Sequence, residues 1–155
     1  SSKIRAARKL NTAGIPMAAT PRNERSPVLS PDGRWLAYVS DEAGQDEIFV
    51  TPFPNAEDGK WQVSTGGGHS AAWSHDSSEL FFVGASNDLI AAKYAVSGGA
   101  FVVTGITPLF NTTGMLMGIN HKAYAVHPDD DRFLVISLGG AEAELVWVQN
   151  WERAL

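Results

Sequence analysis

One polar turn recurs three times along this 155-residue sequence, and it constrains the fold more than any other feature. The segments that contain it are LSPDGRWLAYVS (29–40), WSHDSSELFFVG (73–84) and VHPDDDRFLVIS (126–137). Each segment places an aspartate (Asp32, Asp76 or Asp129) in the turn, and an apolar run begins four residues later. Self-similarity of this kind is typical of architectures that repeat one supersecondary unit. The chain is therefore predicted to contain three copies of such a unit.

The spacing of the turn indicates a β-propeller. The three aspartates are 44 and 53 residues apart, at or a little above the roughly 40–45 residues of one propeller blade. The surplus in the second interval is assigned to the stretch NTTGMLMGIN, residues 111–120. The predicted fold class is therefore all-β, a half β-propeller of three four-stranded blades.

Short runs rich in aromatic and β-branched residues supply the expected strands. They cover 27–29, 35–39, 47–50 and 61–64 in the first blade, 71–73, 80–83, 89–94 and 101–106 in the second, and 123–126, 133–136 and 145–148 in the third. The third blade lacks a fourth run, and the remaining strand-like segment is 4–10. We expect this N-terminal segment to complete the last blade as its outer strand.

The repeat also predicts how the chain is divided. The single propeller-type domain, 1–155, contains an N-terminal clasp strand and connector (1–26), blade 1 (27–66), blade 2 (67–110) and blade 3 (111–155). Three blades leave two apolar faces without a neighbouring blade, and large apolar faces are rarely left in water. We expect a homodimer that closes a six-bladed ring, with blade 3 of each chain on blade 1 of the other.

The repeat resembles that of the TolB-like six-bladed propellers, whose WD40-like repeat carries a Ser-Pro-Asp-Gly turn. The matching segments are SPDGRWLAYVSDEAGQDEIFVTPFP, GKWQVSTGGG, RFLVIS and ELVWVQNW, and they are most similar to the version fused to bacterial Ser/Thr protein kinases. The resemblance implies a bacterial protein in the periplasm or elsewhere outside the cytoplasm. Propellers of this kind serve as docking platforms, sensor regions and accessory domains of peptidases, so the resemblance is specific for fold rather than function. The chain contains no kinase glycine-rich loop, HRD motif or DFG motif.

Composition excludes several classes of partner. A net charge of -5 gives no electrostatic basis for binding nucleic acid, and no apolar stretch approaches the roughly 18 residues that span a bilayer. The sequence contains no cysteine, which excludes disulfides and thiolate zinc sites. The N-terminal SSKIRAARKL has no apolar core and is not a signal peptide as it stands. We therefore expect no nucleic-acid partner, no membrane insertion and no cofactor.

Three local motifs have the residue types of a catalytic or metal site. The stretch 68–72 falls one residue short of a nucleophile elbow around Ser70, but an elbow needs a helix directly after the serine, and a strand is expected there. Ser74-His75-Asp76 has the residue types of a triad, yet neighbours in sequence point apart, so a variant of the repeated turn is predicted. The stretch 127–131 carries three consecutive aspartates without the alternating ligands of an EF-hand, and a surface turn is predicted instead of a metal site.

Polar residues precede the innermost strand of each blade, which borders the central channel of a propeller. By repeat register they are Glu24 and Arg25, His69 and Ser70, and His121 and Lys122. We expect this channel mouth to bind a small anionic ligand or a protein, more tightly as pH falls and the histidines gain charge. The predicted function is a non-enzymatic binding or scaffold module. The alternative is a hydrolase or lactonase that uses His69 and His121 as acid/base residues at the mouth.

Overall fold

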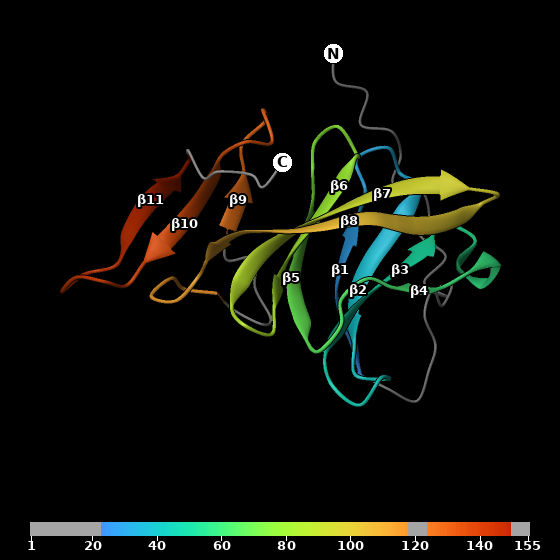
Figure 1. The fold of residues 1–155 in the computed structure, drawn as a ribbon, viewed down its shortest axis with the longest axis horizontal. Coiled ribbons are helices and arrows are strands. Elements are labelled where there is room, and N and C mark those ends of the chain that lie inside the picture. Colours follow the sequence, from blue (N-terminus) through green and yellow to red (C-terminus); the bar gives the residue numbers. More distant parts are fainter. Residues whose placement is uncertain (1–22, 118–123, 150–155) are drawn as a thin grey trace, which may run out of the picture.

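The computed structural model describes residues 23–117 and 124–149, which form three antiparallel sheets (Figure 1). The first sheet contains β1 (Glu24–Leu29), β2 (Trp35–Ser40), β3 (Glu47–Pro52) and β4 (Trp61–Gln62), with the 3-10 helix η1 (Ala56–Asp58) before β4. The second contains β5 (Gly68–Trp73), β6 (Glu79–Gly84), β7 (Asp88–Ser97) and β8 (Ala100–Asn111). The third contains β9 (Tyr124–Val126), β10 (Phe133–Ser137) and β11 (Glu144–Val148).

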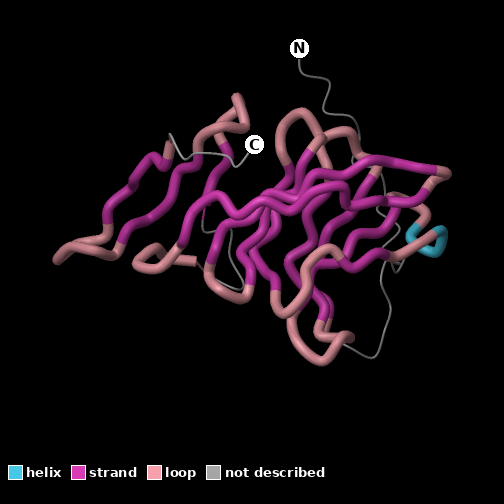
Figure 2. The backbone as a smooth tube through the Cα atoms, viewed as in Figure 1, coloured by secondary structure: helices cyan, strands magenta, loops and turns pink. Residues whose placement is uncertain are grey.

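Neighbouring strands in each sheet are consecutive in the chain, as in propeller blades, and we call the sheets blades 1, 2 and 3 (Figure 2). The predicted all-β half propeller is confirmed. Blade 3 has three strands among the described residues, and the expected clasp strand, 4–10, lies outside them, so its place in blade 3 stays a prediction. Within the described ranges no helix is long and apolar enough to cross a membrane.

The blades stack face to face because their strands are apolar on both sides. In β6 every residue is buried, and successive side chains point to opposite faces of the sheet. Leu80 and Phe82 enter a core shared with Ala37, Val39, Ile48 and Val50 of blade 1. Phe81 and Val83 enter a second core shared with Tyr124, Phe133 and Val135 of blade 3. Blade 2 is therefore the middle layer of the stack.

The hairpin of β7 and β8 is longer than the sequence predicts. The strands have 10 and 12 residues, and Ser97 pairs with Ala100 across a two-residue turn. Gly98 and Gly99 have φ angles of 58° and 81°, a conformation that glycine adopts readily and that two-residue hairpins favour. The extension carries Phe101 to Trp35 of blade 1, with ring centroids 5.2 Å apart.

The repeated turn has the same hydrogen bonds in blades 1 and 2. The Ser30 hydroxyl donates to the Asp32 carboxylate at 2.6 Å and accepts from the amide of Trp35. Ser74 makes the equivalent bonds to the Asp76 carboxylate (2.7 Å) and the amide of Glu79 (2.9 Å). Ser74-His75-Asp76 is therefore a structural turn, as predicted.

The turns of blades 1 and 2 also contact each other, as do those of blades 2 and 3. The residue after the central aspartate is left-handed in all three repeats: Gly33 (φ 74°), Ser77 (57°) and Asp130 (60°). The hydroxyl of Ser77 accepts a hydrogen bond from the amide of Asp32 (3.2 Å). In the same way, the carboxylate of Asp130 accepts from the amide of His75 (2.8 Å). These turn clasps fix the blades to one another at one end of the stack.

Candidate functional site

The predicted mouth lies where β1 begins, β2 ends and β3 begins. Arg25 pairs with Val39, and His69 holds the equivalent position in blade 2, opposite Val83. Each is followed by a bulge with a left-handed serine, Ser26 in blade 1 or Ser70 in blade 2. The equivalence of Arg25 and His69 that the repeat register predicts is present in the two blades. The sequence predicted that both residues precede the innermost strands, whereas they lie within β1 and β5, because these strands begin earlier than predicted.

Asp46, which directly precedes β3, pairs with Arg25 and acts on His69 through its charge. It forms an ion pair with the Arg25 guanidinium. Burial lowers the pKa of His69; the charge of Asp46 opposes this shift and that of Arg25 adds to it. Since the ordinary pKa of histidine is about 6.5, His69 is mostly neutral at pH 7. The mouth thus holds a neutralised cation beside an uncharged imidazole.

Ser70 is nearly buried and links blades 2 and 3 through its main-chain carbonyl group. Its side chain lies 2.8 Å from Nδ1 of His69, but Ser70 is only 8% exposed and β5 continues past it to Trp73. Its carbonyl oxygen accepts a hydrogen bond of 2.6 Å from the Tyr124 hydroxyl of blade 3. Burial raises the pKa of Tyr124, so the phenol remains a donor. The helix that a nucleophile elbow requires is replaced here by strand.

Of the three remaining residues of the predicted mouth, the structure describes one, Glu24. Glu24 begins β1 opposite Ser40 and is partly buried. His121 and Lys122 lie outside the described residues. Anion binding at the mouth therefore stays a prediction. Asp46 was not among the predicted mouth residues. Its position directly before the predicted strand 47–50 was the sequence feature that could have placed it at this end of blade 1.

A buried carboxylate fastens the segment that carries His69. Glu47 is 1% exposed and accepts hydrogen bonds from the Gln45 side chain (3.0 Å), the amide of Gly67 (2.9 Å) and the hydroxyl of Ser64. The Ser64 hydroxyl also accepts from the amide of Ile48 at 2.8 Å. These bonds hold residues 64–67 against the start of β3, next to the mouth.

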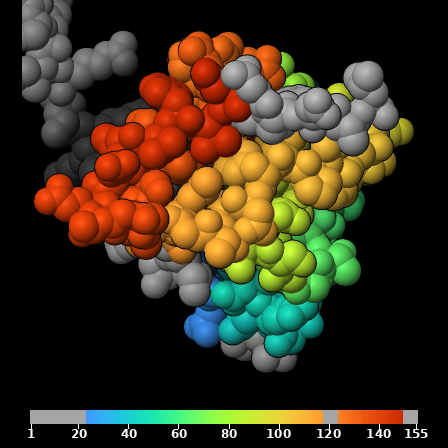
Figure 3. Space-filling model, turned by 60° about the vertical axis from the view of Figure 1, so that its left-hand side comes forward, coloured from blue at the N-terminus to red at the C-terminus, as the bar shows by residue number. Residues whose placement is uncertain are grey.

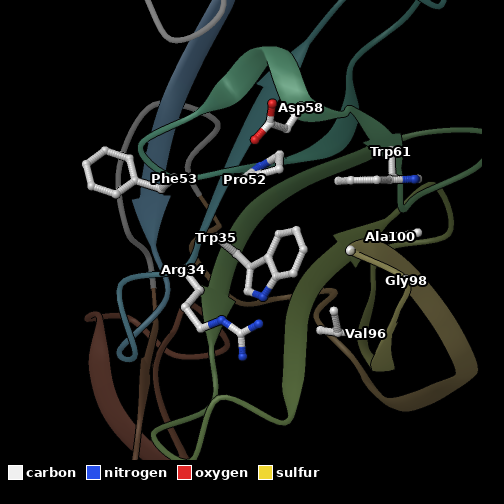
Figure 4. Close-up of a pocket in the computed structure, with 10 residues that line it drawn as sticks. Arg34, Trp35, Pro52, Phe53, Asp58, Trp61, Val96, Gly98 and Ala100 are labelled. Atoms are coloured by element: carbon white, nitrogen blue, oxygen red, sulfur yellow. The ribbon is translucent and has the colours of Figure 1, made fainter.

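The opposite end of blade 1 contains a groove that the sequence does not predict. Its volume is about 620 Å³, and it lies where β2 begins and β3 ends. The lining residues are Arg34, Trp35, Pro52, Phe53, Asp58, Trp61, Val96, Gly98, Gly99 and Ala100. Figure 4 shows Trp61 edge-on above and to the right of Trp35, with Ala100 and Val96 below Trp61. The groove therefore lies between blade 1 and the tip of the long hairpin of blade 2.

Aromatic rings and two charges give the groove its chemistry. Trp61 is partly exposed and meets the buried Trp35 edge to face, with centroids 5.8 Å apart and planes at 76°. One side of its indole rests on Gly59, where a Cβ atom would lie 2.3 Å from the ring. Arg34 and Asp58 are exposed, and within the described part of the chain neither has an ion-pair partner. The same groove is thus lined by a fixed indole and by two exposed side chains of opposite charge.

Trp35 and Trp73 pack in the core between blades 1 and 2. The groove itself depends on the contact between residues 96–100 and β4, which lie far apart in the sequence. That contact exists because the β7–β8 hairpin extends beyond its predicted end.

No protein-family model and no curated protein matches this sequence. Two solved structures are similar in fold, each with a TM-score of 0.46: TolB from Acinetobacter baumannii and a candidate 6-phosphogluconolactonase from Bacteroides uniformis. Sequence identity is 12% to the first and 15% to the second, over 86% and 84% of this chain. The chain covers 42% and 40% of those structures, so it spans less than half the length of either.

Proposed function

We propose that the protein is a non-enzymatic binding module whose ligand is an extended peptide held in the groove between blades 1 and 2. The observation that carries the proposal is Trp61, a partly exposed indole fixed by Gly59 and Trp35 at a concave surface. Aromatic-lined grooves bind extended peptides because prolyl and aliphatic side chains pack on the rings. A prolyl-rich peptide is already extended before it binds, so it loses little conformational entropy.

The charges of the groove favour a peptide with both signs. Arg34 lies at the start of β2 and Asp58 in η1, so the groove offers an anion-binding group and a cation-binding group. A peptide with an acidic residue and a basic residue beside a prolyl segment complements them. Because both side chains are exposed, each contact adds only a fraction of a kcal/mol to about 1 kcal/mol, and the indole supplies most of the affinity.

The groove is not lined by the nucleophilic and acid/base side chains that hydrolases commonly use. Its ten lining residues include no histidine, serine or lysine, and Asp58 is exposed. General acid/base catalysis uses a side chain that is held within hydrogen-bond reach of the reacting atom, whereas no hydrogen bond of the described residues fixes the exposed Asp58 side chain. His69, an acid/base residue of the alternative hydrolase or lactonase hypothesis, lies in β5 of blade 2 and does not line the groove. These features support binding over turnover.

A fluorescence titration with a synthetic peptide panel tests the proposal. The peptides share a prolyl core and differ in whether they carry Arg, Glu, both or neither at their ends. We expect the peptide with both charges to shift the tryptophan emission, and Trp61→Ala to abolish binding. Trp147→Ala, which removes an exposed indole of blade 3, is the matched control and should bind as the wild type does. No binding, or equal binding by Trp61→Ala, contradicts the proposal.

The enzymatic alternative has its own test. Chromogenic esters, lactones and peptides are incubated with the wild type and with His69→Ala. We expect no turnover by either protein. Turnover by the wild type that disappears in His69→Ala would replace the binding module with an enzyme that acts at the mouth.

The resemblance of the repeat to TolB-like propellers and to kinase-fused propellers supports a place outside the cytoplasm, in a docking or sensory role. Fractionation of the native host tests the location. Recovery of the protein in the cytoplasmic fraction would contradict it.

A further inference from the structure

A second hollow lies between blades 1 and 2, apart from the groove. Its volume is about 270 Å³, and its lining includes the apolar residues Val63, Phe82, Ile90 and Ile106 and one charged residue, Asp88. Pockets that hold whole small molecules measure roughly 300–1,000 Å³. The second hollow is therefore of a size for one large side chain, and its walls favour an aliphatic or aromatic one.

The outer strands of the two blades connect the groove to the second hollow. In blade 1, Trp61 of β4 lines the groove, and Val63, which follows β4, lines the second hollow. In blade 2, Ala100 at the start of β8 lines the groove, and Ile106 of the same strand lines the second hollow. A strand advances about 20 Å over six residues. The groove and the second hollow thus lie about this far apart along one boundary between the blades.

The strand that connects them has a free edge. β8 is the last strand of its sheet, and among the described residues no strand pairs with its outer edge. Figure 3 shows residues 100–111, in gold, at the surface of the molecule. Proteins commonly protect exposed edge strands with charged side chains or proline. β8 contains no charged residue, and Pro108 lies beyond Ile106, so the main-chain groups from Ala100 to Ile106 can accept an added strand.

The orientation of Ile106 gives such a strand a place for a side chain. Ile106 pairs with Ala92, a residue of the core shared with blade 1, so it lies on the face of β8 that is turned toward blade 1. Phe101 and Val103 pack on the same core, whereas Ile106 is 49% exposed beside the second hollow. Directly opposed residues of paired strands have their side chains on one face. A side chain opposite Ile106 would therefore be directed to the second hollow.

We propose that the peptide held in the groove continues along β8 as an added antiparallel strand and inserts an apolar side chain into the second hollow. The inference rests on the proposed function, because one peptide occupies both places. Antiparallel pairing is slightly more stable than parallel pairing, and β8 runs from the groove toward the second hollow. The apolar residue of the peptide therefore precedes its prolyl segment by about six residues. The homodimer expected from the sequence joins blade faces rather than this edge and stays a separate prediction.

Two related peptides test the added strand. The core peptide is the prolyl peptide with both charges, and the extended peptide carries six further N-terminal residues, of which the first is leucine. We expect calorimetry to show that the extended peptide binds about tenfold more tightly. The same six residues should add little at the C-terminus, or with serine in place of leucine. Equal affinities of the core and extended peptides overturn the proposal.

Methylation of the peptide amides identifies strand pairing directly. Successive residues of a strand direct their main-chain groups to opposite sides, so only alternate amides face the neighbouring strand. N-methylation of single residues in the extension should therefore weaken binding at every second position, by about threefold to tenfold. Loss of affinity without this alternation overturns the proposal.

A substitution at Ile106 separates the second hollow from the groove. Ile106→Asp should remove the gain of the extended peptide and leave binding of the core peptide unchanged. Leu138→Asp, at a position next to β10 that is also 49% exposed, is the matched control and should keep the gain. Circular dichroism shows whether Ile106→Asp folds, and Ile106→Ser is the second variant if it does not. A gain that persists in a folded Ile106 variant overturns the proposal.

The core peptide also separates this proposal from the proposed function. If the core peptide binds through Trp61 and the extension adds nothing, the groove is a binding site and the added strand is wrong. If neither peptide binds, both proposals are wrong. Light scattering without peptide tests the other occupant of the edge, a second copy of the chain. A wild-type dimer that becomes monomeric in Ile106→Asp overturns the proposal, because β8 of another copy then occupies the edge.

Discussion

Removing Phe133 from the core between blades 2 and 3 should destabilise the whole chain. Phe133 and Phe81 are both 0% exposed, belong to different blades and meet edge to face with centroids 4.9 Å apart. Truncation of a fully buried phenylalanine to alanine costs about 3–5 kcal/mol, part of it from the cavity that remains. A domain of this size has about 5–15 kcal/mol of stability. Phe133→Ala should therefore lose a large fraction of the free energy of unfolding and still fold.

A double-mutant cycle isolates the contact between the two blades. Phe81→Ala should cost a similar amount, and the double variant should cost less than the sum, since both changes open one cavity. The edge-to-face pair alone contributes about 0.5–1.5 kcal/mol to this coupling. Urea unfolding followed by circular dichroism measures all four proteins, at one low concentration so that association does not contribute. Ile106→Ala, at a position that is 49% exposed, should change stability by no more than about 0.5 kcal/mol.

Two results would refute the stacked arrangement. Free energies that add within about 0.5 kcal/mol would mean that the two rings do not share a core. A loss below about 1 kcal/mol for Phe133→Ala would mean that the ring is not buried against blade 2.

The pKa of His69 is lowered in the folded chain, so the contribution of the neutral imidazole to stability is complete above about pH 6.5 and is lost as pH falls below that value. The unfolding midpoint should therefore decrease from pH 7.5 to 5.5. This decrease should be smaller in His69→Asn than in a His75→Asn control. Inorganic phosphate should bind the mouth more tightly as pH falls from about 8 to 5.5, measured by calorimetry, and equal binding by an Arg25→Ala, His69→Ala double variant would move the site elsewhere. Glu47→Gln places an amide NH2 among hydrogen-bond donors and should lower stability by about 1–3 kcal/mol, which urea unfolding measures; no change would mean that Glu47 is not held by those donors. Gly33→Ala should lower the free energy of unfolding by about 1–2 kcal/mol, because φ of Gly33 is 74°. No atom lies within 4 Å of an added Cβ, so a clash would not explain the loss, and an unchanged unfolding midpoint would contradict the left-handed turn.

The strands and blades were predictable because their signals are local. Each turn fixes where the next apolar run begins, and a continuous apolar run such as Leu80–Val83 is typical of a strand that is buried on both faces. The β7–β8 extension was not predictable from burial, because Lys93 and Ala95 to Gly99 are exposed. In that part the pairing is supported by a two-glycine turn rather than by a core.

The mouth was partly predictable for the same reason. Arg25 and His69 have the same offset from their turns, so repeat register places them in equivalent positions. Asp46 belongs to a different strand connection, and its pairing with Arg25 appears only when β1 and β3 flank β2. The groove requires contacts between two blades, which no pattern in a single run of residues encodes.

The turn clasps do not require a particular order of the repeats along the sequence. In each clasp a main-chain amide, which any residue except proline supplies, donates to a side-chain acceptor. The second clasp adds a contact of 2.9 Å between His75 Nδ1 and the Asp130 carboxylate, which the first does without. A duplicated or exchanged repeat therefore needs no matched partner residue in the repeat before it. It needs only a short acceptor such as Ser77 or Asp130 at one left-handed position. Recombination between repeats can alter the number of blades without simultaneous substitutions in two of them.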